Sequence, residues 1–282
     1  MYRYVNYVKE YGRIMQFNKN KDICIHRWYP FVEGYSKEFI EAIVNEQPQK
    51  VESCLEPFSG SGTTALELAI KGISCISFEV NPFMFTLSKA KLKVSQYKKR
   101  TIRSHISKMK KHIVSLNDNE IDLHSGFSTL IEGKEKKKWN IDREVFIAIE
   151  KIKRAINSLS TTLYKEVYIV CLANILLEYS NLYRNGKCLS YKKDWKENLY
   201  SQEQVITSFF NFINNVIIED LEKLGTNNFS NHDLLYLGDT RKLIFENVDD
   251  NSVDLIITSP PYLNSRDYTD SYMLELKALD FL

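Results

Sequence analysis

The sequence lacks the features that would place this chain in a membrane, outside the cell or around a zinc ion. No stretch approaches the roughly 20 consecutive apolar residues that a membrane-spanning helix needs. The first ten residues, Met1–Glu10, contain no apolar run of the kind found in signal peptides. The five cysteines are scattered, odd in number and form no Cys-x-x-Cys pair. These absences predict a reduced, cytoplasmic protein with neither a disulfide framework nor a metal site.

The sequence also has little excess charge. The 38 basic residues nearly balance the 36 acidic ones, so the net charge is only +2. The overall charge therefore gives no indication of nucleic-acid binding. A chain of 282 residues can bury a large core, and one or two domains are expected.

The most informative stretch that is present lies near the end of the sequence. A short apolar strand, Val253–Ile257, leads into Ser259-Pro260-Pro261-Tyr262. Each proline fixes φ near −65° and has no backbone N–H, so the strand must end in a stiff turn whose carbonyls are free to accept hydrogen bonds. With an aromatic ring beside it, this turn can hold an exocyclic amine of a flat ring. An ordinary Pro-Pro loop is the alternative interpretation.

A second pattern lies upstream, where a short strand enters Pro57–Thr64 and a helix starts at once. Gly60 and Gly62 permit positive φ and close approach of a ligand to the backbone. The helix N-terminus offers unpaired N–H groups to an anion. The next strand, Ile73–Glu79, ends in a carboxylate, which is how doubly wound folds hold ribose hydroxyls. The glycine spacing is not that of a dinucleotide fold, so nicotinamide is a poor candidate.

Together these segments resemble the S-adenosylmethionine-dependent amino-methyltransferases that modify bacterial DNA. Pro57–Thr64 resembles the cofactor loop of that family, and Glu79–Pro82 resembles its ribose-binding segment. Leu237–Thr240 resembles the strand end beside the cofactor's adenine, and Ser259–Tyr262 resembles the catalytic tetrapeptide. The four motifs occur in a compatible order, and the resemblance covers roughly residues 23–92 and 232–282. It implies an α/β fold with a doubly wound, Rossmann-like methyltransferase sheet.

The resemblance also implies site residues. The catalytic residues would be Ser259, Pro260, Pro261 and Tyr262. S-adenosylmethionine would be held by Pro57, Phe58, Ser59, Gly60, Gly62, Thr63, Glu79, Asn81 and Asp239.

The implied reaction is methyl transfer to the exocyclic amine of a base in double-stranded DNA, in a restriction-modification or defence setting. The target base must leave the duplex stack to reach the site. Tyr262 would stack on it, while the side chain of Ser259 and the carbonyl of Pro260 accept from the amino group. In the family, Ser at the first position is more often associated with N4 of cytosine, and Asp with N6 of adenine. An RNA methyltransferase acting on guanine N2 is an alternative.

The sequence predicts four zones along the chain. Residues 1–50 form an N-terminal arm and helix before the cofactor loop, and residues 51–92 form the cofactor-binding half of the core. Residues 93–231 form a helical insertion that is a possible DNA-contacting region. Residues 232–282 carry the catalytic strands and the Ser-Pro-Pro-Tyr turn.

Three basic segments are candidates for contact with DNA phosphates, although a charge run is more often a solvated surface. The first runs from Lys89 to Lys111, and the second is Lys134–Trp139. The third, Tyr183–Lys193, is the strongest candidate because tyrosines and a Gly turn accompany its cations. The residues predicted to contact nucleic acid are Arg184, Lys187, Lys192 and Lys193.

The sheet predicted from the sequence is incomplete at its C-terminal end. Only four good strands are evident, at Cys54–Leu55, Ile73–Phe78, Leu234–Leu237 and Val253–Ile257. The family has seven, and an exposed sheet edge is a liability. Either the chain is a fragment, or the enzyme is split and a second polypeptide completes the sheet. We expect a second polypeptide to supply the missing C-terminal strands. An alternative function is then that of half of a split methyltransferase, which is inactive alone and acts as a cofactor- or DNA-binding subunit.

Overall fold

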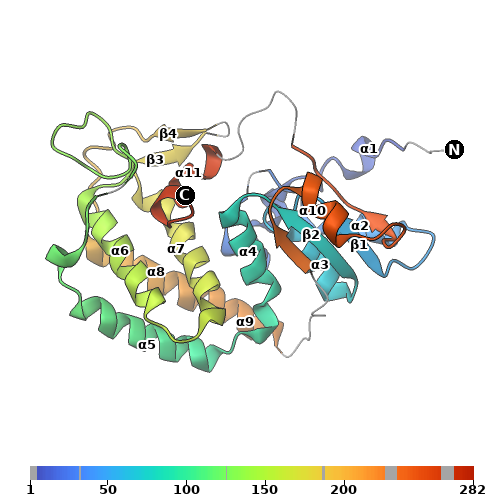
Figure 1. Ribbon diagram of the computed structural model, residues 1–282, viewed down its shortest axis with the longest axis horizontal. Coiled ribbons are helices and arrows are strands. Elements are labelled where there is room, and N and C mark those ends of the chain that lie inside the picture. Colours follow the sequence, from blue (N-terminus) through green and yellow to red (C-terminus); the bar gives the residue numbers. More distant parts are fainter. Residues whose placement is uncertain (1–4, 32, 125, 186–187, 226–233, 262–269) are drawn as a thin grey trace. The chain divides into compact units, whose positions relative to one another are not determined.

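The computed structural model describes residues 5–31, 33–124, 126–185, 188–225, 234–261 and 270–282 (Figure 1). The chain divides into two compact units. The first consists of residues 1–95 and 226–260, and the second of residues 96–225 and 261–282. The predicted insertion, residues 93–231, therefore spans most of the second unit, and the boundary between the units falls between Pro260 and Pro261, within the tetrapeptide predicted to be catalytic.

The first unit is an α/β structure built on a parallel sheet. Its four strands are β1 (Ser53–Glu56), β2 (Ser74–Glu79), β5 (Leu234–Leu237) and β6 (Leu255–Ile256), in the order β5-β2-β1-β6. All three pairings are parallel. These are the four strands that the sequence predicts, and the arrangement is compatible with a Rossmann-like methyltransferase. The remaining elements of this unit are α1 (Val8–Tyr11), η1 (Phe17–Asp22), η2 (His26–Trp28), α2 (Lys37–Asn45), α3 (Thr63–Lys71), α4 (Pro82–Leu92) and α10 (Thr240–Asn247).

The core of this unit lies between one face of the sheet and the helices α2 and α3. Because side chains alternate along a strand, Cys54 of β1 and Cys75 of β2 point to the same face, where they are fully buried. Ile40 of α2 and Leu68 of α3 pack in the same cluster. Burial of these apolar side chains fixes α3 against the sheet and thereby fixes the loop from which α3 starts.

The strand β6 lies at the edge of the described sheet. Ile257, directly after it, is 4% exposed, but Ile256 is 56% exposed. The apolar run Leu255–Ile257 is thus buried on one face and open on the other. Parallel sheets are normally covered on both faces, so the face that carries Ile256 is only partly covered by the described residues.

The second unit is mainly helical. Two of its helices, α6 (Arg143–Asn157) and α7 (Lys165–Tyr179), bury the apolar stripes that the sequence predicts, including Phe146 and Ile152. The other elements are η4 (Asp118–Glu120), η5 (Thr162–Tyr164), η7 (Asp270–Tyr272), α5 (Lys99–Ser115), α8 (Gln202–Phe212), η6 (Ile213–Ile218), α9 (Glu219–Leu224) and α11 (Met273–Ala278). The 3-10 turn η3 (Val94–Gln96) spans the boundary between the units.

The helix α8 confirms one local prediction and corrects another. Ser201 and Gln204 form the predicted capping box at its start. The predicted stripe continues through Phe212 and Val216, but these side chains are only partly buried, and Ile213 and Ile217 are fully buried instead. The cause is the π-helical turn η6, which widens the helix and shifts the buried face by about one residue.

A short antiparallel hairpin, β3 (Leu182–Arg184) and β4 (Leu189–Tyr191), interrupts the helices of the second unit. It contains most of the segment Tyr183–Lys193 that the sequence analysis selected as a basic loop. Lys187 lies outside the described residues.

Candidate functional site

The candidate site is formed at the carboxyl ends of the parallel strands. The residues that follow β1, β2 and β5 meet there through hydrogen bonds. The hydroxyl of Thr240, after β5, donates to the carbonyl oxygen of Pro57, after β1, at 2.6 Å. The amide of Gly238 donates to the carbonyl oxygen of Glu79 at 2.8 Å. The structure therefore brings together three of the four motifs that the sequence analysis identified separately.

The carboxylate of Glu79 is the centre of this arrangement. Its Oε2 accepts from the amide of Gly60 at 2.7 Å, and its Oε1 accepts from the amide of Asn81 at 2.8 Å. Burial raises the pKa of Glu79, while the two backbone hydrogen bonds oppose that rise. One side chain thus connects the glycine loop after β1 to the turn after β2.

The two loop glycines are required by both conformation and space. Gly60 has φ of +53° and Gly62 has φ of +76°, a region that L-residues rarely adopt. A Cβ on Gly60 would lie 2.9 Å from the ring of Phe31, and one on Gly62 would lie 2.8 Å from Oγ of Ser88. In the described structure, the close neighbours of these glycines are therefore protein side chains.

Two side chains of the helix α4 donate hydrogen bonds to backbone carbonyl groups of this loop. The hydroxyl of Ser88 donates to the carbonyl oxygen of Gly60, and the amine of Lys91 donates to that of Ser61, both at 2.9 Å. Lys91 is fully buried, and burial lowers its pKa to about 7. Neither Ser88 nor Lys91 was predicted from the sequence, and their spacing of three along a helix is the only signal that could have linked them.

A buried acid that the sequence analysis did not select lies at the end of β1. Glu56 is 1% exposed, and its Oε1 accepts from the hydroxyl of Tyr35 at 2.6 Å. Burial raises the pKa of Glu56 well above its usual value. Within the described part of the chain, Oε2 of Glu56 and Oγ of Ser59 are buried without a hydrogen-bond partner. A carboxyl group directly before Pro57, in an otherwise apolar strand, is the signal that could have identified it.

Three predicted cofactor residues have clear local roles. Asn81 caps α4 by accepting from the amides of Phe83 and Met84. Asp239 caps α10 by accepting from the amide of Arg241, whose guanidinium also pairs with the carboxylate at 2.7 Å. These hydrogen bonds from Arg241 lower the pKa of Asp239 to about 2. Thr63 begins α3 and is buried.

The remaining predicted residues differ in exposure. Ser59 is buried, Pro57 is partly buried, and Phe58 is 38% exposed. Ser259, Pro260 and Pro261 are exposed after β6. Because β6 pairs in parallel with β1, Ser259 follows a strand that ends at the same edge of the sheet as the glycine loop. Tyr262 lies outside the described residues.

Two of the predicted nucleic-acid residues, Arg184 and Lys192, lie in the second unit and already have protein partners. The guanidinium of Arg184 donates to Oε1 of Glu275 at 2.5 Å and to the carbonyl oxygen of Ser271 at 3.0 Å. The amine of Lys192 donates to the carbonyl oxygens of Glu178 and Ser180. Lys193 is exposed.

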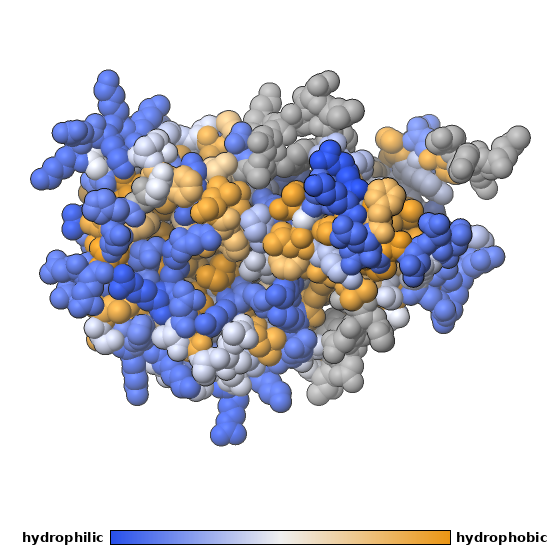
Figure 2. Space-filling view, viewed as in Figure 1, coloured by the Kyte–Doolittle hydropathy of each residue, from blue (hydrophilic) through white to orange (hydrophobic). Residues whose placement is uncertain are grey.

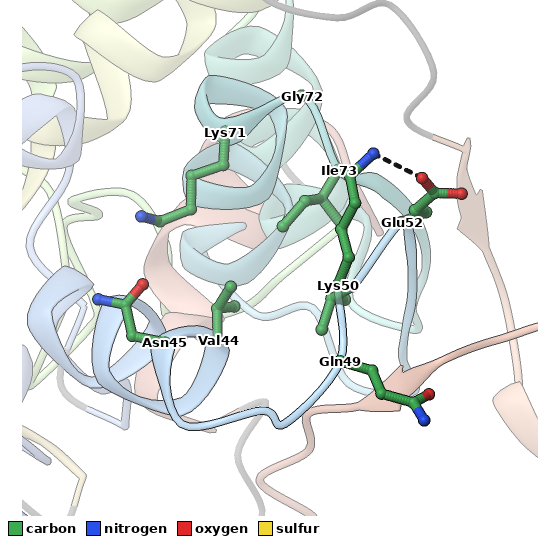
Figure 3. Close-up of a pocket in the computed structure, with 9 residues that line it drawn as sticks. Val44, Asn45, Gln49, Lys50, Glu52, Lys71, Gly72 and Ile73 are labelled. Carbon is green, nitrogen blue, oxygen red and sulfur yellow. Dashed lines mark hydrogen bonds and ion pairs between the residues drawn. The ribbon is translucent and has the colours of Figure 1, made fainter.

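A surface pocket of about 410 Å³ lies away from this site, at the amino ends of β1 and β2 (Figure 3). It is lined by the end of α2, the segment before β1 and the turn after α3. Its charged residues Lys50 and Glu52 form an ion pair at 2.6 Å, and both are largely exposed. An exposed ion pair of this kind does not make a preorganised site, so we place the candidate site at the carboxyl ends of the strands.

Comparisons with known proteins give relatives of one kind. No family model matches the chain. It is 24% identical over 304 residues to the type II methyltransferase M.BsoBI of Geobacillus stearothermophilus, an alignment that covers 98% of this chain and 58% of the relative. It is 25% identical to the type II methyltransferase M.AvaI of Nostoc sp., over 95% of this chain and 56% of the relative. It is 27% identical to M.MvaI of Kocuria varians, another type II methyltransferase, over 88% of this chain and 55% of the relative.

The chain thus spans a little over half the length of these relatives. The similarities support a relationship to methyltransferases of restriction-modification systems, in agreement with the four motifs. In the described parts of the chain, the helices are too short or too polar to cross a bilayer. The same residues contain no cluster of side chains suited to hold a metal ion.

Proposed function

We propose that this chain carries the cofactor-binding and catalytic residues of an S-adenosylmethionine-dependent DNA amino-methyltransferase. The observation that carries the proposal is the meeting of Pro57, Glu79 and Thr240 at the carboxyl ends of three adjacent parallel strands. Open α/β sheets bind their ligands in this position. The type II methyltransferases to which the chain is similar supply the reaction class.

The side chains at this edge fit S-adenosylmethionine in their chemistry. Glu79 offers a carboxylate for the ribose hydroxyls, and Asp239, at the end of the neighbouring strand, suits the adenine amine. The buried, unpartnered atoms of Glu56 and Ser59 can pair with the polar groups of the methionine part. The cofactor supplies an electrophilic methyl group. The residues Pro57, Phe58, Gly60, Gly62, Thr63 and Asn81 shape the loops around it.

The role proposed for the tetrapeptide is to hold the amine of a flipped base. The side chain of Ser259 and the carbonyl of Pro260 accept from the amino hydrogens, which draws the nitrogen lone pair out of conjugation with the ring. Tyr262 stacks on the base, and Pro261 keeps the turn stiff. The rate gain then comes from orientation and preorganised hydrogen bonding, and the step needs no covalent enzyme intermediate. The serine favours N4 of cytosine over N6 of adenine.

The edge position of β6 supports a further part of the proposal. Ile256 is 56% exposed, and the described sheet has no strand beyond β6. We propose that a parallel strand supplied by other residues, on a second polypeptide or on a longer chain, pairs with β6 and covers Ile256.

Methyl transfer tests the function directly. The chain, together with a second polypeptide that supplies the strand beside β6, is incubated with tritium-labelled S-adenosylmethionine and duplex DNA, and the DNA is digested to nucleosides. Label in N4-methylcytosine supports the full proposal, and label in N6-methyladenine corrects the target base alone. Incorporation into RNA with none into DNA would overturn the substrate.

A pair of variants connects the reaction to the proposed turn. Tyr262→Ala should lose about 1–3 kcal/mol of base stacking and turn over more slowly while binding the cofactor as before. Tyr262→Phe keeps the aromatic ring and is the matched control. Equal turnover by wild type and Tyr262→Ala would remove this residue from the site.

A further inference from the structure

Two basic segments that are far apart in the sequence form one surface in the second unit. The first, Lys134–Trp139, lies on the loop before α6, and the second, Tyr191–Lys196, follows β4. The rings of Trp139 and Trp195 meet edge to face with centroids 4.8 Å apart, and Tyr191 lies 5.2 Å from Trp195. Aromatic contacts at these distances are favourable. The two segments therefore hold each other in place.

Hydrogen bonds fix the base of this surface. The indole nitrogen of Trp139 donates to Oδ1 of Asp142 at 2.6 Å, and the amide of Asn181 donates to the carbonyl oxygen of Asn140 at 2.8 Å. The hydroxyl of Tyr191 donates to Oδ1 of Asn140 at 3.1 Å. The surface is therefore preorganised, and binding a partner would cost little ordering of the backbone.

Lysines project from this aromatic base. The amine of Lys138 lies 5.3 Å from the ring centroid of Tyr191, and that of Lys196 lies 5.4 Å from the ring of Trp195. Such cation–π contacts restrict a long side chain while leaving its charge exposed. In the two segments, six exposed lysines outnumber two exposed acids. Figure 2 shows blue, hydrophilic side chains at the upper left, over the loops beside β3 and β4 of Figure 1.

We infer that the surface formed by Lys134–Trp139 and Tyr191–Lys196, here called the lysine–tryptophan surface, binds the phosphate backbone of double-stranded DNA. The inference rests on the proposed function, because the DNA substrate is what selects a polyanion as the partner. It goes beyond that function by assigning the DNA contact to a particular surface, which is formed by two segments that are far apart in the sequence.

The residue types predict what this contact does. Both segments contain lysine but no arginine. Lysine binds phosphate as a point charge, whereas arginine favours paired hydrogen bonds to base edges. The lysine–tryptophan surface should therefore contribute affinity and orientation, and it should contribute no choice of sequence.

The salt dependence of DNA binding tests this inference. The full chain is titrated into a fluorescein-labelled duplex without cofactor, and the dissociation constant is measured by anisotropy from 50 to 300 mM NaCl. The slope of log K against log salt falls by about 0.9 for each phosphate contact that is lost. The triple variant Lys138→Gln/Lys193→Gln/Lys196→Gln should lower the slope by up to about 2.7, by the same amount on duplexes of unrelated sequence.

A matched control removes the same charge elsewhere in the second unit. Lys108, Lys110 and Lys111 are exposed on α5, and the corresponding triple glutamine variant should leave the slope unchanged. The inference is overturned if the control triple lowers the slope and the test triple does not, if both lower it equally, or if wild type binds no duplex at 50 mM salt. Tighter binding of single-stranded RNA than of duplex DNA would also overturn it.

Other measurements separate this inference from the proposed function. Thermal melting of each triple variant checks that it is folded. If a triple variant is not folded, variants with single substitutions of the same lysines are measured in its place. If wild type methylates DNA while the test triple keeps the full salt slope, the surface assignment alone fails. If the test triple loses slope but wild type transfers no methyl group to DNA under any condition, the proposed function alone fails.

Discussion

The amine of Lys91 donates a hydrogen bond to the carbonyl oxygen of Ser61 at 2.9 Å, although Lys91 is fully buried. A lysine in this position loses its hydration, and its pKa falls to about 7. The loop proposed to bind the cofactor is therefore supported by an amine whose charge changes near neutral pH. This relationship gives the first prediction.

The stability of the protein should depend on pH through Lys91. In the unfolded chain this lysine stays protonated up to about pH 10.4. Between about pH 7 and pH 10 the unfolded state therefore binds more protons than the folded state, and the free energy of unfolding rises with pH. Lys91 contributes at most about 1.4 kcal/mol per pH unit to the slope of the free energy of unfolding against pH. This slope is zero below about pH 7, where both the folded and the unfolded states are protonated.

Urea unfolding from pH 6 to pH 10 measures this dependence. Lys91→Met removes the titrating amine and should flatten the curve relative to wild type. Lys71→Met changes an exposed lysine of the same unit and should leave the curve as in wild type. Parallel curves for wild type and Lys91→Met would show that Lys91 does not titrate in this range.

Replacement of Glu79 should weaken cofactor binding. In Glu79→Ala the amides of Gly60 and Asn81 lose their acceptor, and the carboxylate proposed for the ribose is gone. Calorimetry with S-adenosylmethionine should show an affinity loss of tenfold or more, about 1.4 kcal/mol. Glu52→Ala, in the pocket at the opposite ends of the strands, is the control and should bind as wild type (Figure 3). Unchanged affinity in Glu79→Ala would remove this residue from the site.

Two glycines with nearly the same φ allow strain and close packing to be separated. Gly72 has φ of +73° with no atom within 4 Å of an added Cβ, while Gly62 has φ of +76° with Ser88 at 2.8 Å. Gly72→Ala should cost about 1–2 kcal/mol of conformational strain. Gly62→Ala should cost a further 1–3 kcal/mol through overpacking and should also weaken cofactor binding. Urea unfolding measures both, and Ser88→Gly in the Gly62→Ala background should restore part of the loss. Equal costs at the two glycines would contradict the packing argument.

The ion pair between Arg184 and Glu275 should stabilise the second unit. Glu275 is fully buried and the side chain of Arg184 is 11% exposed. Removal of one partner leaves a buried charge uncompensated, so Glu275→Ala should lower the free energy of unfolding by about 3–5 kcal/mol. If Arg184 instead serves mainly to contact DNA, Arg184→Met should weaken DNA binding with little loss of stability. Urea unfolding and anisotropy on the same samples decide between these roles.

Completion of the sheet should be needed for activity. Because Ile256 is exposed on an edge strand, we expect the 282-residue chain alone to be poorly soluble and inactive. It should associate with residues that supply a strand beside β6, through an apolar interface of about 2,000 Å² or more. Activity should appear when those residues are added as a second polypeptide. A monomeric and fully active 282-residue chain would refute this expectation.

The sequence by itself determined the local parts of this protein. The apolar run Leu234–Leu237 specifies a strand, and Ser201 with Gln204 specifies a helix start. The turn at Gly60 and Gly62 and the carboxylate that ends β2 were also evident. These features depend on hydrophobic periodicity, backbone conformation and capping, which act between residues a few positions apart.

Only the tertiary structure decided how these parts meet. The strand order β5-β2-β1-β6 places Glu79 against Gly60, and helix packing places Lys91 beneath Ser61. The same holds for Trp139 beside Trp195. Nothing local distinguishes Arg184, which is paired with Glu275 91 positions away, from an exposed lysine such as Lys193. Contacts between residues so far apart in the sequence depend on how all the helices and strands pack their apolar surfaces together. No short stretch of sequence therefore predicts them.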